Sequence, residues 1–207
     1  MPAGSEQLTQ ARREEIVDAC ARLYETMPFG KITLGAIGAQ TSFTRTSIYN
    51  YFCTKEEIFL ALLEREYAAW TKDVLSLAAH PVAREAFPAA FAALLEERGC
   101  MLKLLSMNLY DLDAGSRTEN LVAFKRAYGA SMQAVERCLA AHFALSGERA
   151  QRFLYAFYPF LFGVYPYTAV TEKQRRAMEI AGVAYRSCTV SELTRAFIED
   201  LIAGFGA

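Results

Sequence analysis

The polar side chains between residues 44 and 50 are of types that bind nucleic acid. If this segment is a helix, its exposed side chains are those of Thr44, Arg45, Thr46, Ser47, Tyr49 and Asn50. Arginine can form two hydrogen bonds with a guanine edge in the major groove, asparagine can pair with adenine, and hydroxyl groups can reach phosphates. The partial positive charge at a helix N-terminus adds to the attraction. We therefore interpret this segment as a surface that contacts DNA.

The charge around this segment supports that interpretation. Residues 26–55 contain three basic residues, Lys31, Arg45 and Lys55, and no Asp or Glu, which gives a formal charge of +3. The whole chain has 22 Lys+Arg and 23 Asp+Glu, a net charge of −1. That balance excludes a generally basic protein that coats nucleic acid regardless of sequence. Contact with DNA is therefore predicted at one local patch.

Residues that could support catalysis or hold a metal are sparse. His80 and His142 are the two histidines, and neither has metal-ligand spacing to another His or Cys. Neither a GxSxG motif nor a glycine-rich phosphate loop occurs. The five cysteines lie at least 33 residues apart and form no CxxC motif; they are Cys20, Cys53, Cys100, Cys138 and Cys188. We expect no enzyme activity, no cofactor, no metal and five free thiols.

The composition is that of a globular protein. The chain has 207 residues, of which 53% are hydrophobic and 22% charged, and these values exclude disordered, collagen-like and disulfide-scaffold classes. The first residues contain no apolar region behind a basic one, so we expect no secretory signal and a cytoplasmic location. Residues 153–171 carry no charge, but two prolines and four tyrosine hydroxyls favour a protein interior over a membrane span.

The hydrophobic pattern predicts an all-α protein. Apolar residues recur at three- and four-residue steps, and several helix starts have Ser or Thr followed three residues later by Glu or Gln, as at Thr171 and Thr189. Helices between residues 28 and 53 are short and later ones long, so we predict an N-terminal domain at 1–54 and a helical bundle at 55–207. The predicted helices span residues 6–27, 33–40, 44–51, 54–79, 83–112 with a break, 117–143, 147–165, 172–184 and 189–204.

The segment from Thr33 to Lys55 has the pattern of a helix-turn-helix motif. Two short helices are joined by a tight connection, and Gly38 offers the small surface that a closely crossing helix needs. The predicted core of the motif consists of Leu34, Ile37, Phe43, Ile48 and Phe52.

At these positions the chain resembles the TetR/AcrR family of bacterial transcriptional regulators. The signature consists of a first helix that ends near Phe29, the run from Thr33 to Ile37, the run Ser-Ile-Tyr-Asn-Tyr-Phe at residues 47–52, and Lys55 followed by Glu. It covers residues 10–66. The rest of the chain is similar to the family only in length and helical character.

The resemblance implies a role for each residue of the motif. It implies that Arg45, Thr46, Ser47 and Asn50 face bases, and that phosphates are held by Thr33, Thr44, Tyr49, Tyr51 and Lys55. The family usually has a small residue and a glycine in the turn, where this chain has Thr41 and Ser42. We therefore expect a left-handed residue other than glycine in the turn, at a cost of about 1 kcal/mol.

The resemblance also implies a ligand-responsive regulator, most commonly a repressor that binds a palindromic operator as a dimer and is released by a small effector. The long C-terminal aromatic run predicts an apolar or aromatic effector. The predicted lining consists of Trp70, Tyr110, Phe124, Tyr128, Met132, Tyr155, Tyr158 and Tyr165. An apolar ridge on the last helix predicts dimerisation through Leu193, Phe197 and Leu201, flanked by Val190 and Phe205.

Several alternatives stay open from sequence alone. The aromatic run could be a bundle core or a dimer interface instead of a ligand cavity. The chain could also be a helical small-molecule-binding or adaptor protein with no role on DNA. The sequence leaves open the effector, the operator, the target genes, activation as against repression, and any assembly beyond a dimer.

Overall fold

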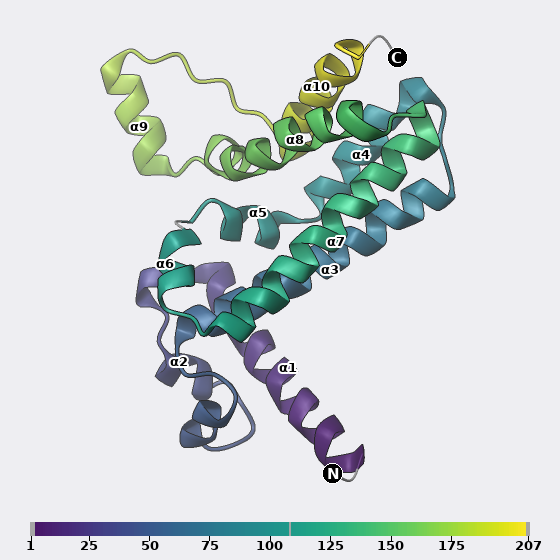
Figure 1. Ribbon diagram of the computed structural model, residues 1–207. Helices are drawn as coiled ribbons and strands as arrows, with labels where there is room; N and C mark the ends of the chain where they lie inside the picture. The colour runs from purple at the N-terminus through teal and green to yellow at the C-terminus, as the bar shows by residue number, and fades with distance from the viewer. Residues whose placement is uncertain (1–2, 108, 206–207) are drawn as a thin grey trace. The chain divides into compact units, whose positions relative to one another are not determined.

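The computed structural model describes residues 3–107 and 109–205, which contain helices and no strand (Figure 1). This confirms the predicted all-α class. The helices are α1 (Ala3–Thr26), η1 (Phe29–Lys31), α2 (Leu34–Gly38), η2 (Arg45–Asn50), α3 (Lys55–Ala79), η3 (Arg84–Ala86), α4 (Phe87–Glu96), α5 (Gly99–Leu105), α6 (Leu109–Ala114), α7 (Thr118–Phe143), α8 (Gly147–Thr168), α9 (Glu172–Ala181) and α10 (Val190–Ala203). The η elements are short 3₁₀ helices.

The chain divides into two compact units. The first comprises Met1–Glu66 and Asn108–Tyr128, and the second comprises Tyr67–Met107 and Gly129–Ala207. The first unit thus includes the predicted N-terminal domain, and it also takes in α6 and the start of α7. The division at residue 54 stays a prediction.

The helix predicted over residues 83–112 is divided more often than the single expected break. The chain forms η3, α4, α5 and α6 there. Arg98 leaves the helical conformation, with φ −103° and ψ 33°, directly before Gly99 begins α5. Glycine is a poor helix former, and the Arg98 guanidinium lies 2.9 Å from the carboxylate of Asp73. The break therefore coincides with the glycine and with this ion pair.

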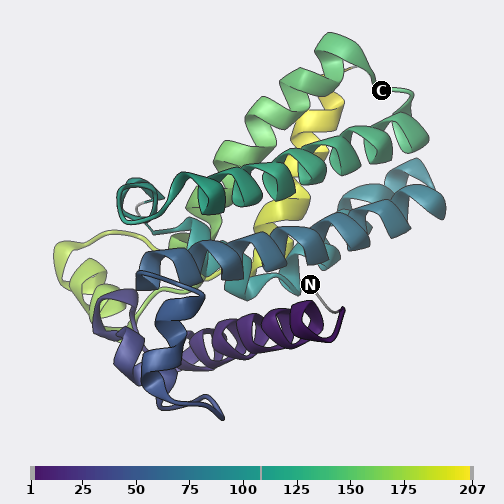
Figure 2. The same ribbon diagram turned by 60° about the horizontal axis from the view of Figure 1, so that its bottom comes forward.

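In the first unit, α1 packs its apolar side against α2 (Figure 2). Ile16, Ala19 and Cys20 are fully buried, and Tyr24 meets the ring of Phe59 edge-on at 5.1 Å. Four residues separate Cys20 from Ile16 and Tyr24, so all three lie on one face of the helix. The long first helix therefore forms one wall of this unit's core.

The core of the second unit is filled with aromatic rings. Trp70 is fully buried, with its ring centroid 5.3 Å from Phe91 and 6.1 Å from Phe157. Its indole Nε1 has no hydrogen-bond partner among the described residues. The last helix, α10, packs against α4 and α8 through a buried face formed by Thr194, Ile198 and Ile202. The aromatic run of the sequence thus supplies part of this core.

His142 is a packing residue inside the second unit. The side chain is 7% exposed. Its Nε2 accepts a hydrogen bond from the Val82 amide at 3.2 Å, and Nδ1 lies 2.8 Å from the Cys138 carbonyl. One ring nitrogen accepting and the other donating is the pattern of a neutral imidazole. Burial also raises the pKa of the Cys138 thiol to about 12, so this thiol stays protonated.

The uncharged stretch at residues 153–171 belongs mostly to α8. Phe153, Phe157 and Leu161 are fully buried and Val164 nearly so, so one face of the helix covers the core while the other carries exposed tyrosines. Among the described helices none combines the length and the apolarity that crossing a bilayer requires.

Replacing Tyr158 by phenylalanine should lower the free energy of unfolding by about 1 kcal/mol, because a buried hydrogen bond is lost. The Tyr158 hydroxyl lies 2.7 Å from the hydroxyl of Ser131, and both residues are buried. Tyr155→Phe is the matched control, since Tyr155 is 75% exposed and should not change stability. Urea unfolding of both variants gives the comparison, and equal midpoints would contradict the role assigned to Tyr158.

Candidate DNA-binding surface

The helix-turn-helix motif is assembled around three fully buried side chains. Ile37 of α2, Ile48 of η2 and Phe52 after it have no exposed surface. These three belong to the predicted core, whereas Leu34 and Phe43 are half-buried. Thr33 begins α2 by accepting a hydrogen bond from the amide of Ala36 at 3.1 Å.

The second helix of the motif is shorter and tighter than predicted. Instead of an α-helix over 44–51, Arg45–Asn50 forms the 3₁₀ helix η2. The Ser47 amide donates to the Thr44 carbonyl at 2.8 Å, and the hydroxyls of the same two residues lie 2.8 Å apart. Thr and Ser form such local bonds in competition with α-helical geometry. The hydroxyl-rich start of this segment is the physical reason for the difference.

The turn between the two helices contains no left-handed residue. The one non-glycine residue with a positive φ in the described part of the chain is Ala144, so the expected strain at Thr41 and Ser42 is wrong. The Thr41 hydroxyl donates to the Gly38 carbonyl at 2.9 Å. The amide and the hydroxyl of Ser42 both donate to the carboxylate of Glu15 in α1. Side-chain hydrogen bonds thus hold this turn.

The predicted DNA contacts differ in how far they reach solvent. Five of them are exposed: Thr33, Thr44, Thr46, Tyr49 and Asn50. Three are half-buried: Ser47, Tyr51 and Lys55. The side chain of Arg45 lies outside the described part of the structure. All nine residues lie between Thr33, the N-cap of α2, and Lys55, the first residue of α3, so the exposed polar groups gather on one short stretch of chain.

Lys55 and Tyr51 also make contacts inside the first unit. The ammonium group of Lys55 donates to the Phe29 carbonyl at 3.1 Å and lies 4.1 Å from the centre of the Phe29 ring. The Tyr51 ring is tilted against that of Phe43 at 6.3 Å. Because an ammonium group has three donors, Lys55 keeps the capacity for a further contact.

Two arginines of α1 add positive charge beside the helix-turn-helix motif. The guanidinium of Arg13 lies 4.4 Å from the centre of the Phe52 ring, and that of Arg12 lies 5.7 Å from the centre of Phe43. Both side chains are half-buried. Their contact with the motif comes from tertiary packing, for which the sequence holds no local signal.

A buried carboxylate ties the end of the motif to the segment before α7. Glu57 is 1% exposed. Its carboxylate oxygens lie 2.6 Å from Nε and 2.9 Å from Nη2 of Arg117, and they also accept the amides of Cys53 and Arg117. Nearby, the Thr54 hydroxyl donates to the Gly115 carbonyl at 2.7 Å. Desolvation alone would raise the pKa of Glu57, but the hydrogen bonds that its carboxylate accepts from Arg117 and Cys53 outweigh desolvation and lower the pKa.

The predicted effector residues of the second unit do not share one environment. Trp70 and Tyr158 are buried, whereas Tyr155 is 75% exposed. Tyr155 and Tyr158 therefore lie in different environments, and their shared role in effector binding stays a prediction. Three of the other predicted effector residues belong to the first unit, where Tyr110 is exposed, Phe124 is buried and Tyr128 is half-buried. Met132 and Tyr165 of the second unit are half-buried.

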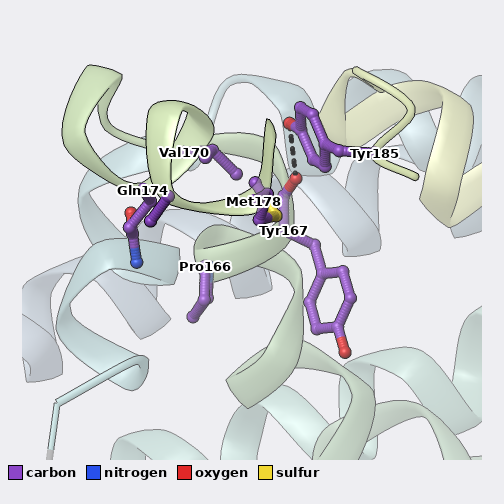
Figure 3. Close-up of a pocket in the computed structure, with 7 residues that line it drawn as sticks. Pro166, Tyr167, Val170, Gln174, Met178 and Tyr185 are labelled. Atoms are coloured by element: carbon purple, nitrogen blue, oxygen red, sulfur yellow. Dashed lines mark hydrogen bonds between the residues drawn. The ribbon is translucent and has the colours of Figure 1, made fainter. Parts of the chain in front are cut away.

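Two apolar cavities lie elsewhere in the second unit. A cavity of about 350 Å³, here called the arm cavity, is formed by the end of α8, by α9 and by Tyr185 (Figure 3). A second cavity of about 300 Å³, here called the α8–α10 groove, lies between α8 and Leu193 of α10. None of the eight predicted effector residues lines either cavity.

Half-buried apolar side chains lie on α10 beside the α8–α10 groove. They include Leu193, Phe197 and Leu201 of the predicted dimer ridge. The Phe197 ring stacks on Phe160 of α8, with centroids 4.1 Å apart and planes 1° from parallel. The ridge therefore continues from α10 onto α8 as one apolar surface.

Known proteins resemble the chain over nearly its whole length. The family model described as bacterial regulatory proteins, tetR family, matches residues 16–62, and the one described as tetracyclin repressor-like, C-terminal domain, matches residues 64–207. No curated protein sequence matches the chain.

Among solved structures, the fatty acid degradation regulator FadR from Bacillus halodurans has a similar fold, with a TM-score of 0.58 at 12% identity. The match covers 92% of this chain and 94% of that one. SmeT, the repressor of the Stenotrophomonas maltophilia multidrug efflux pump SmeDEF, matches with a TM-score of 0.49 at 19% identity, over 91% of this chain and 90% of that one.

Proposed function

The chain belongs to the TetR family of bacterial regulatory proteins, and on that premise we propose that it is a repressor that binds a palindromic operator as a homodimer and is released by a small effector. Its activity is that of a ligand-responsive, DNA-binding transcriptional regulator. The observation that carries the proposal is the helix-turn-helix motif at residues 33–55, with its exposed hydroxyl and amide side chains on η2 and no acidic residue.

The proposed contacts with DNA fall into two groups. Arg45, Thr46, Ser47 and Asn50 face base edges in the major groove. The phosphates on either side are held by Thr33, Thr44, Tyr49, Tyr51 and Lys55. Thr33 can cap α2 and contact a phosphate at once, because its hydroxyl accepts from Ala36 and keeps its own proton to donate.

Arg45→Ala should weaken binding to the matched operator by about 1–3 kcal/mol and relax the preference at one base pair in each half-site. Lys55→Ala should weaken matched and mismatched duplexes alike, because a phosphate contact carries no base information. Titration of both variants against matched and singly mismatched operators separates the two roles. An unchanged base preference in Arg45→Ala would remove Arg45 from base recognition.

The proposed dimer follows from the geometry of DNA. Two copies of η2 must reach major grooves about 34 Å apart, or a multiple of that distance, which one chain with one motif cannot do. The apolar surface shared by α8 and α10 supplies a face that a second copy can cover, with Leu193, Phe197 and Leu201 at its centre. A twofold axis through this face makes the operator an inverted repeat.

Control by the effector follows from linkage between two conformations. An effector that binds better to the conformation in which the two motifs are wrongly spaced lowers the affinity for DNA, and DNA must lower the affinity for the effector by the same factor. The C-terminal unit is the proposed place of binding.

Selection of bound sequences from random duplex DNA tests this function. The expected outcome is an inverted repeat with half-site centres about one helical turn, or a multiple of it, apart. Recovery of no common sequence, with an affinity that depends on salt alone, would reject sequence-specific regulation.

A further inference from the structure

Helix α9 is an exposed arm of the second unit that is fixed at both ends. It lies apart from α8 and α10 in Figure 1 and contributes no buried residue. At its start, Thr171 and Gln174 form a capping box. At its end, Gly182 adopts the left-handed conformation, with φ 66°, and its amide donates to the Glu179 carbonyl at 3.2 Å. The arm thus has a defined geometry without having packed its apolar side.

An unpacked helix of this length lacks the usual source of helical stability. Ten residues form a marginal helix in water, and packing of an apolar face normally supplies the rest. The face of α9 that carries Ala177 and Met178 lines the arm cavity. At one side of the cavity, Tyr185 donates a hydrogen bond to the Tyr167 carbonyl at 3.3 Å and joins the segment after α9 to the end of α8 (Figure 3). The arm therefore borders apolar space that opens to solvent, instead of packing its apolar face away.

The cavity has the size and the lining of a small-molecule site. Its volume of about 350 Å³ is within the usual range for such sites. The walls are apolar apart from a small number of polar groups, and they consist of Pro166, Tyr167, Val170, Gln174, Ala177, Met178 and Tyr185.

Gln174 supplies the hydrogen-bond donor of the cavity. Its Oε1 is occupied by the amide and the hydroxyl of Thr171, both at 3.0 Å. Its Nε2 has no hydrogen-bond partner among the residues that the structure describes. Because the capping box fixes Oε1, the amide nitrogen is held in place as a donor.

We propose that the arm cavity binds the effector, and that this effector is a flat, uncharged, apolar molecule with one hydrogen-bond acceptor that pairs with Nε2 of Gln174. This deepens the proposed function and rests on it, because it gives the effector a place within the second unit. The rings and the thioether of Met178 contact the apolar body, and aromatic groups pack well against both. The bound molecule supplies the packing that α9 lacks.

The test compares two probes of nearly equal shape, 2-acetylnaphthalene and 2-isopropylnaphthalene, by calorimetric titration of the full chain. The first has a carbonyl acceptor and the second replaces it by a methyl group. The wild-type protein should bind one acetyl probe per chain and prefer it by about five- to tenfold, the effect of one hydrogen bond.

Two pairs of variants locate the site. Ala177→Phe fills the cavity and should weaken both probes by about tenfold or more, whereas Ala181→Phe adds the same ring to an exposed position of α9 outside the cavity and should bind as the wild type. Gln174→Glu keeps an acceptor for the capping box but removes the donor, so the preference for the acetyl probe should disappear. Ile180→Glu adds the same charge outside the cavity, at a side chain that is 75% exposed, and should keep the preference.

Several results would overturn the proposal. The first is that the Ala177→Phe protein still binds the probes, and the second is that the Gln174→Glu protein still prefers the acetyl probe. The third is that neither probe binds the wild-type protein. Dissociation of the dimer by Ala177→Phe in sedimentation would also overturn it, since the cavity would then be a contact between copies. Operator binding without any probe is measured in parallel. Its absence in the wild type would reject the proposed function, and its presence without probe binding would reject the arm cavity alone.

Discussion

Phe197→Glu is expected to convert the proposed homodimer into monomers at micromolar concentration and to abolish binding to an inverted-repeat operator. The ring lies at the centre of the apolar surface shared by α8 and α10, stacked on Phe160. A carboxylate there would be buried without a partner when two copies meet, at a cost of several kcal/mol. Each 1.4 kcal/mol raises the dissociation constant about tenfold. Sedimentation equilibrium and operator titration measure the two effects.

Ala203→Glu is the matched control for the dimer prediction. It introduces the same carboxylate at an exposed position of the same helix, and it should leave both the dimer and the operator affinity unchanged. A Phe197→Glu protein that remains a dimer and binds its operator would contradict the proposed interface. A protein that is monomeric and still binds both half-sites with full affinity would contradict the need for a dimer.

Arg117→Ala should lower the free energy of unfolding by about 2–4 kcal/mol, more than any other single polar substitution predicted above. It leaves the carboxylate of Glu57 buried, with only the amides of Cys53 and residue 117 as partners, and an uncompensated buried charge is costly. Glu57→Gln should cost less, about 1 kcal/mol, because Arg117 is 51% exposed and can be solvated by water. Denaturant unfolding of both variants tests this order, and a larger loss for Glu57→Gln would contradict it.

The same ion pair predicts a dependence of stability on pH. The pKa of Glu57 is lowered from its ordinary value of 4.5 in the folded chain, so its contribution is fully present above that value and is lost as the pH falls towards the folded pKa. The stability difference between wild type and Glu57→Gln should therefore be constant near neutral pH and shrink as the pH falls below 4.5. Because the two proteins share every other titratable group, the difference between their free energies of unfolding reports the titration of Glu57. A constant difference would show that Glu57 is not responsible.

The sequence predicted the parts of the fold that depend on short-range patterns. The capping boxes at Thr171 and Thr189 are confirmed, because both partners lie within one turn of helix. The buried side chains Ile37, Ile48 and Phe52 of the motif are likewise confirmed. The capping boxes are one-turn relations, and Ile48 and Phe52 are four residues apart, so residue types and short spacings determine them directly.

The differences arise where a tertiary contact decides the outcome. Tyr155 and Tyr158 are 60° apart around a helix, and that spacing does not fix where the buried face ends. Ser42 is held by Glu15, which is 27 residues away, and Arg117 reaches Glu57 across 60 residues. No local pattern marks such pairs. The sequence did not predict the arm cavity either, because the cavity depends on the contact between Tyr185, after α9, and Tyr167.

The buried position of Trp70 means that tryptophan fluorescence reports the unfolding of the second unit. It is the single tryptophan of the chain and is fully buried beside the rings of Phe91 and Phe157, so its emission should lie at short wavelength and shift to the red when water enters. Trp70 belongs to Tyr67–Met107, and the first unit contains no tryptophan. Melting of the operator-binding motif should therefore be silent in this signal while circular dichroism records it, so that the two units report their unfolding separately.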